Sequence, residues 1–154
     1  MPDLIIELAL WAAAISTGLM AGIYLAFSVF LMAALKALPD SIGMASMNSI
    51  NRVILESAFM PLFFGSSLLA FLLMLFAYAG SASLWIISAG VVYLLGMLAC
   101  TVVVNVPLNN RLQEVTSENA SKVWQHYTIY WTRWNHLRTI SSLLACIFYM
   151  LALK

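Results

Sequence analysis

The sequence has little charge, and this scarcity excludes most classes of soluble protein. Only 8% of its 154 residues are charged, seven basic and six acidic, whereas soluble domains carry about 25%. A net charge of +1 provides no concentrated basic face, so we expect no nucleic-acid partner. Intrinsic disorder is excluded because disordered chains are rich in charge and poor in apolar residues.

Residues that bind metals or form cross-links are also scarce. The two cysteines, Cys100 and Cys146, are too few for a disulfide scaffold and read as buried, inert thiols. The two histidines, His126 and His136, lie about 15 Å apart along one expected helix, so one chain cannot place both on one iron. Phosphate-binding loops and zinc motifs are missing from the sequence. We therefore expect no metal and no other cofactor.

Long apolar runs are what the sequence has instead. It is 64% hydrophobic, with a mean hydropathy of +0.97, and residues 8–35 and 57–110 carry no charge. A membrane helix needs about 20 apolar residues, so the first run supports one span and the second supports two, divided by small residues at 79–83. The expected spans lie near 8–33, 57–79 and 84–106, the third ended by Pro107.

A fourth span requires charged residues near the membrane. After Arg138 only residues 139–153 are free of charge, which gives roughly 22 Å of helix against a hydrocarbon core about 30 Å thick. We therefore expect this helix to begin near Trp131 and to cover 131–153. That places His136 and Arg138 at or below the membrane surface.

These patterns predict a single all-α domain covering residues 1–154. Every backbone polar group in lipid must find a partner within the protein, which favours helices. We expect a four-helix transmembrane bundle with short interfacial helices in the two longer loops, near 41–56 and 117–135. The expected partner is the lipid bilayer.

The basic residues predict the orientation of the bundle. Six of them lie in or beside the two longer loops, and only Lys154 lies on the opposite side. Because basic loops stay in the cytoplasm, we expect both termini outside it. The six are Lys36, Arg52, Arg111, Lys122, Arg133 and Arg138.

Small residues recur every four positions on the first expected helix, with a glycine pair at Gly18 and Gly22 flanked by Ala14 and Ala26. Such a ridge lets another helix backbone approach closely. The partner helix can belong to the same bundle or to a second copy of the chain, which would make a homo-oligomer. The sequence leaves both alternatives open.

Polar side chains gather toward the cytoplasmic ends of all four expected helices. Ionisable groups inside a membrane are costly and usually functional, and Glu56 is the expected ion-pair partner of Arg138. The alternative is that these groups cap helix ends and reach the headgroups. The polar residues are Ser28, Asn48, Asn51, Arg52, Glu56, Asn105, Asn109, Asn110, Asn135, His136 and Arg138.

Five aromatic residues precede or open the fourth span: Trp124, Tyr127, Tyr130, Trp131 and Trp134. One interpretation is an interfacial belt, where amphipathic rings prefer the headgroup level. The other is the wall of a site for a planar ligand. Both interpretations remain open.

Several motifs together resemble the anthrone oxygenases, a family of small four-helix membrane proteins whose members are mostly bacterial. The motifs are Gly22-Ile-Tyr24-Leu-Ala26-Phe27-Ser28, Met47-Asn48 with Asn51, Asn105-Val-Pro107-Leu-Asn109 and Trp131-Thr-Arg133-Trp134-Asn135-His136-Leu-Arg138. The resemblance implies oxidation of an anthrone to an anthraquinone by dioxygen without a cofactor. It also places the chain in a bacterial inner membrane.

The implied chemistry assigns roles to the polar and aromatic residues. His136 would be the base, because its ordinary pKa suits proton abstraction near neutral pH, and Arg138 would act beside it. The developing oxyanion would be held by Arg138, Asn105, Asn109 and Asn135. The planar substrate would stack on Trp131, Trp134, Tyr24 and Phe27. The expected substrate-binding residues are Tyr24, Phe27, Ser28, Asn105, Asn109, Trp131, Trp134 and Asn135.

A non-catalytic membrane protein is the alternative: a small-molecule binder or an accessory subunit whose polar cluster is structural. An enzyme should have a partly apolar cavity reached by His136. A structural cluster should have its amides and Arg138 fully hydrogen-bonded. Transport is a weaker third possibility, because no inverted repeat or broken helix is evident.

Overall fold

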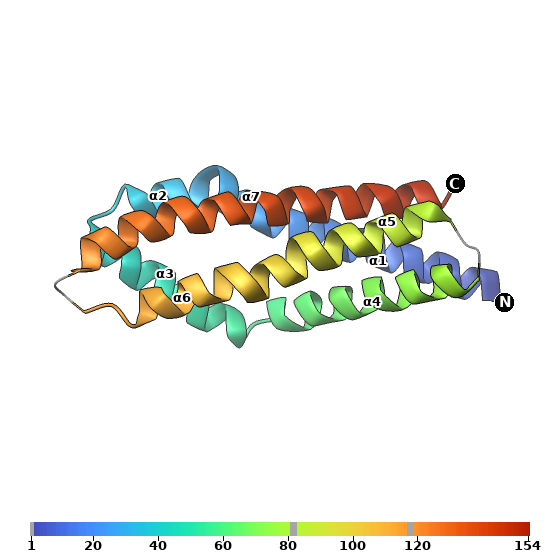
Figure 1. Cartoon of the computed structure of the whole chain (residues 1–154), viewed down its shortest axis with the longest axis horizontal. Helices are drawn as coiled ribbons and strands as arrows, with labels where there is room; N and C mark the ends of the chain where they lie inside the picture. Colours follow the sequence, from blue (N-terminus) through green and yellow to red (C-terminus); the bar gives the residue numbers. More distant parts are fainter. Residues whose placement is uncertain (1, 81–82, 117–118) are drawn as a thin grey trace.

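The structure is a computed structural model that describes residues 2–80, 83–116 and 119–154. In these ranges all regular secondary structure is helical, and the helices form an elongated bundle with both termini at the same end (Figure 1). The elements are α1 (Pro2–Ala26), η1 (Phe27–Leu31), α2 (Met32–Lys36), α3 (Asp40–Leu55), α4 (Phe59–Ala79), α5 (Leu84–Tyr93), η2 (Leu94–Ala99), η3 (Thr101–Asn105), α6 (Val106–Gln113) and α7 (Ala120–Ala152).

Several of these elements join into longer rods. The junctions at Ala26, Leu31 and Tyr93 keep right-handed helical backbone angles, so the π-helical segments η1, η2 and η3 are wide turns within continuous helices. Three helices are long and apolar enough to cross a membrane: Leu4–Lys36, Phe59–Ala79 and Leu84–Gln113. They overlap the first three expected spans and identify a membrane protein by length and composition.

The expectation that Pro107 ends the third helix is wrong. The helix continues through Pro107 to Gln113, and the π-helical segment η3 lies directly before it. A proline removes a backbone donor and crowds the carbonyl four residues earlier. A wide π turn relieves that crowding and changes the hydrogen-bond pattern where the donor is missing.

Of the two short helices expected in the longer loops, one is present as a separate helix and the other is not. A separate helix, α3, occupies the position expected near 41–56. The second expected helix is not separate, because α7 runs without interruption from Ala120 to Ala152; residues 117–118 of the expected range lie outside the described residues. α7 packs along α1 and α5 for much of its length (Figure 1).

The helices pack around two buried clusters. One joins α1, α4, α5 and α7 near the termini, with Met20, Tyr93 and Tyr149 at its centre. The other joins α2, α3, α6 and the first half of α7, around Met47 and Trp124. Between these two ends lies the level at which the polar side chains meet.

At Gly96 a close helix contact depends on glycine. A Cβ at Gly96 would lie 1.9 Å from the Ser141 Oγ, so η2 approaches α7 as only glycine permits. On the small-residue ridge of α1, a Cβ at Gly18 would lie 3.4 Å from the Cys146 Sγ of α7, whereas Gly22 has nothing within 4 Å. Gly18 therefore packs within the bundle.

Candidate functional site

A cavity of about 340 Å³ lies at the level where the polar side chains meet. This volume falls in the range of about 300–1,000 Å³ that is usual for small-molecule sites. Its walls come from α1, η1, α3, α4, η3, α6 and α7. The lining residues are Ile23, Tyr24, Phe27, Asn48, Asn51, Arg52, Ile54, Leu55, Phe59, Met60, Phe63, Phe64, Thr101, Val102, Val106, Asn109, Asn110, Gln113, Trp131 and Arg138.

Arg138 forms the inner wall of this cavity and is only 5% exposed. Its guanidinium carbon lies 4.4 Å from the centre of the Tyr24 ring and 4.9 Å from that of Trp131. One terminal nitrogen donates to the Asn135 Oδ1 at 2.7 Å, and the other donates to the Thr101 Oγ1 at 3.5 Å. These groups are all neutral, so the stabilisation of the buried charge comes from ring faces and two hydrogen bonds.

Asn135 holds the guanidinium in place. Its Nδ2 donates to the Tyr24 carbonyl oxygen and to the Ser28 Oγ, both at 2.7 Å, which leaves its Oδ1 for Arg138. Thr139 adds a hydroxyl contact of 3.2 Å to Ser28. The amide thus inserts into the first helix where that helix widens into η1, and it connects α1 to α7 beside the cavity.

Three residues that line the cavity carry buried donors without a hydrogen-bond partner. They are the Nε of Arg138, the Nε1 of Trp131 and the Nδ2 of Asn51. Buried polar groups are nearly always satisfied, and each exception requires an explanation. Unpartnered donors on residues that line one cavity fit a ligand that brings oxygen atoms, and the cation of Arg138 favours an anionic one.

The outer part of the cavity is lined by amides. Asn109 accepts a hydrogen bond of 2.8 Å from the Tyr127 hydroxyl, and burial raises the pKa of Tyr127, which keeps that hydroxyl a neutral donor. Asn48 donates to the Leu112 carbonyl at 3.4 Å. Asn110 and Gln113 are exposed, so this side of the cavity reaches the surface at the end of the bundle opposite the termini (Figure 1).

The structure places five of the expected site residues in the cavity wall: Tyr24, Phe27, Asn109, Trp131 and Arg138. Three more lie behind that wall. Ser28 and Asn135 belong to the network just described, and the Asn105 Nδ2 donates to the Trp131 carbonyl at 3.3 Å. These three residues position the wall and do not line it.

Two other expected site residues do not line the cavity. His136 is exposed, and Trp134 is 40% exposed. Successive residues of a helix are about 100° apart, so His136, two positions before Arg138, lies on nearly the opposite face of α7. The expectation that His136 reaches the cavity as a base is therefore not met.

The expected ion pair between Glu56 and Arg138 is also corrected by the structure. Glu56 is exposed at the C-terminal end of α3. Arg138 is buried and donates to Asn135 and Thr101 instead. An exposed carboxylate keeps its hydration, which it would lose by entering the bundle.

Sequence reasoning missed much of the α4 wall, where Phe59, Phe63 and Phe64 line the cavity. It also missed Thr101, which hydrogen-bonds to Arg138. The spacing of Phe59 and Phe63 by one helical turn was a usable signal. Thr101 gave none, because a threonine in an apolar helix commonly bonds to its own backbone, as this one does to the Met97 carbonyl at 2.7 Å.

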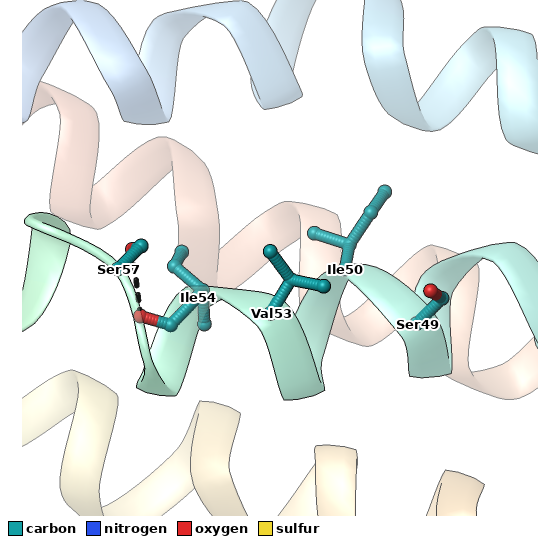
Figure 2. Close-up of a pocket in the computed structure, with 5 residues that line it drawn as sticks. All are labelled: Ser49, Ile50, Val53, Ile54 and Ser57. Carbon is teal, nitrogen blue, oxygen red and sulfur yellow. Dashed lines mark hydrogen bonds between the residues drawn. The ribbon is translucent and has the colours of Figure 1, made fainter.

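A second hollow, of about 310 Å³, lies on the surface of α3 and its C-terminal turn (Figure 2). It is lined by Ser49, Ile50, Val53, Ile54 and Ser57. The Ser57 hydroxyl already donates to the Ile54 carbonyl at 2.8 Å (Figure 2). Without a buried charge or an open donor among its lining residues, this hollow is a weaker candidate than the cavity at Arg138.

Comparison with known protein families gives a match. No curated protein and no solved structure is detectably similar to the chain. The family described as anthrone oxygenase matches residues 51–148. This range covers well over half of the sequence and includes α4 and the α7 residues of the cavity wall, Trp131 and Arg138. The chain belongs to the anthrone oxygenase family.

Proposed function

We propose that this protein is a membrane-embedded oxygenase that acts on a planar aromatic, anthrone-like substrate in the cavity beside Arg138. Membership of the anthrone oxygenase family supports the class of reaction. The cavity supports a ring-shaped substrate, since Tyr24, Phe27 and Trp131 supply aromatic surface next to the guanidinium.

The proposal includes α7 as a fourth membrane span. Arg138 is the main obstacle to this assignment, because a bare charge in lipid is costly. Its charge is turned into the bundle and is covered by two rings, an amide and a hydroxyl. With Arg138 covered, residues from about Trp131 to Ala152 present mainly apolar side chains to the surroundings, such as Ile140, Leu143 and Ile147.

The proposed chemistry needs an anion and a place to hold it. An anthrone loses a proton from its methylene carbon to water and becomes an enolate, and Arg138 stabilises the enolate oxygen. The enolate passes one electron to dioxygen, and the resulting radical and superoxide combine into a peroxide at the same carbon. The peroxide anion takes a proton back from water, and the resulting hydroperoxide loses water to give the anthraquinone ketone. One dioxygen is consumed, and one water and one quinone are formed.

A single observation carries this proposal: Arg138 is a buried cation in the cavity wall, its Nε donor has no hydrogen-bond partner, and the side chains that contact its guanidinium are all neutral. A buried charge in such a place costs stability unless a counter-ion arrives. An enolate or phenolate oxygen is the counter-ion that an anthrone-like substrate would bring.

The rival function is a non-catalytic binder or accessory subunit. One observation favours a structural role for part of the cluster, since Asn105 and Asn135 are satisfied by the backbones of neighbouring helices. The open donors of Arg138, Trp131 and Asn51 do not fit a purely structural cluster. A binder without catalysis would keep the cavity but would not consume oxygen.

The test compares oxygen uptake by matched arginine variants in lipid nanodiscs. We expect anthrone-dependent uptake above the spontaneous rate in the unchanged protein, and a loss of about 100-fold in Arg138→Gln, as is usual when an oxyanion donor is removed. Arg133→Gln, an exposed arginine on the same helix, is the control and should retain full activity. Uptake no faster than in empty nanodiscs would overturn the proposed oxygenase.

A further inference from the structure

The cavity has apolar, exposed side chains on one flank. Leu55, Phe64, Val102 and Val106 all line it, and their exposed fractions range from 42% to 63%. A side chain that both lines a cavity and reaches the surface lies at its rim. We call this rim the lateral opening.

The lateral opening follows from how α4 packs. Among the described residues, α4 packs closely on α1, α3, α5 and η2, whereas η3 and α6 are not among its close partners. Phe64 on α4 and Val102 and Val106 on the η3–α6 stretch therefore face each other only across the cavity.

The depth of the lateral opening places it in the hydrocarbon region. Phe64 and Val102 lie within two of the three helices that are long and apolar enough to cross a membrane. Phe64 is five residues from the start of α4, which corresponds to about 7 Å along the helix. We infer that Phe64 and Val102 lie below the headgroup level, beside acyl chains, whereas Arg52, Asn110 and Gln113 form the polar outer side.

We propose, building on the function proposed above, that the lateral opening is a portal through which a membrane-dissolved planar hydroxyaromatic reaches Arg138 directly from the bilayer. The apolar rings pass between Phe64 and Val102, and the acidic oxygen enters first toward the guanidinium. The polar outer side serves the water that accepts the proton. The width of the ring system that can pass the portal is then set by Val102, Val106 and Phe64.

The experiment measures binding, so that it does not depend on turnover. The probe is a dihydroxyanthraquinone dissolved in the nanodisc lipid, whose visible absorption shifts when it ionises beside a cation. Val102→Trp narrows the portal and should slow binding about tenfold, since steric restriction acts on the association rate. Val103→Trp is the matched control, because Val103 is 70% exposed and does not line the cavity.

A ring-sulfonated dihydroxyanthraquinone, which stays in water, forms the second arm and should bind much more slowly than the lipid-dissolved probe. Equal association rates in Val102→Trp, Val103→Trp and the unchanged protein would overturn the portal, as would equal rates for the two probes. Thermal unfolding of each variant establishes that it is folded. Binding without oxygen uptake would overturn the oxygenase alone, and no binding by the unchanged protein would overturn both proposals.

Discussion

Arg138 lies between two aromatic ring faces, with an amide and a hydroxyl at its terminal nitrogens. This arrangement uses the shape of the guanidinium as well as its charge. A planar group can stack between rings and still direct its N–H bonds sideways, whereas a lysine ammonium is a compact, strongly hydrated point charge. The site therefore distinguishes two side chains that carry the same charge.

We expect Arg138→Lys to lose at least about tenfold in kcat/KM for anthrone oxidation, because the charge remains but the stacking and the paired hydrogen bonds are lost. Oxygen uptake at varied anthrone concentrations provides the measurement. Arg133→Lys is the control, since Arg133 is exposed. Full activity in Arg138→Lys would mean that only the charge matters.

We expect His136→Ala to retain the activity of the unchanged protein within about twofold, as is usual for exposed positions away from the chemistry. The imidazole lies on the outer face of α7, out of reach of a substrate in the cavity. The oxygen-uptake assay described above measures the activity of His136→Ala. A loss comparable to that of Arg138→Gln would restore His136 as a candidate base and would require α7 to rotate.

At the scale of elements, an amide side chain bonds α7 to the first helix, and a glycine lets η2 approach α7 closely. Asn135 bonds across to Tyr24 and Ser28, and Gly96 allows η2 to contact Ser141. The cavity wall depends on both contacts, because Tyr24 and Arg138 come from the two helices that Asn135 joins, and Thr101 begins η3 two residues after η2 ends.

Gly96→Ala should destabilise the bundle by about 1–3 kcal/mol, because overpacking forces neighbouring atoms apart. Differential scanning fluorimetry in detergent should record this as a lower Tm. Adding Ser141→Gly to Gly96→Ala removes the atoms that the new methyl group would meet. This double variant should regain part of the lost stability. Gly22→Ala has open space around it and should leave the Tm unchanged or slightly higher, so an equal drop in both alanine variants would contradict the close contact.

The helices themselves were largely predictable from sequence, because charge is excluded from long membrane helices whatever packs around them. Three apolar helices overlap the expected spans, and the sequence motifs identify Arg138, Trp131 and Tyr24 as candidate site residues. His136 and Glu56 were placed wrongly because charge patterns give depth but not the direction in which a side chain points. That direction depends on the rotation of each helix, and π turns such as η3 change it.

At the scale of the whole molecule, the proposed four spans and the basic loops make an orientation that can be measured. If α7 crosses the membrane, Lys154 and the α6–α7 connection lie on opposite sides. We expect Lys154→Cys to react with a membrane-impermeant thiol reagent in intact cells, and Glu114→Cys only after permeabilisation. Both native cysteines lie within the bundle, and the unchanged protein measures their background.

Labelling of both engineered cysteines from the same side would contradict the fourth span, and labelling of Glu114→Cys alone in intact cells would reverse the orientation. The basic side chains favour the cytoplasm for the loops by their number. The three apolar helices alone would place the two termini on opposite sides of the membrane, because they make an odd number of crossings. The labelling experiment distinguishes this arrangement from four spans.

Both chain termini lie at the end of the bundle away from the α3 and α6 helices that surround the outer side of the cavity (Figure 1). With the four spans proposed above, an affinity handle or a fluorescent domain fused to either terminus would sit on the far side of the bilayer from the amides at Asn110 and Gln113. Immobilising the protein through such a fusion would leave the cavity unobstructed. Surface-based ligand capture and solution assays should therefore report the same affinity for a ligand of the cavity.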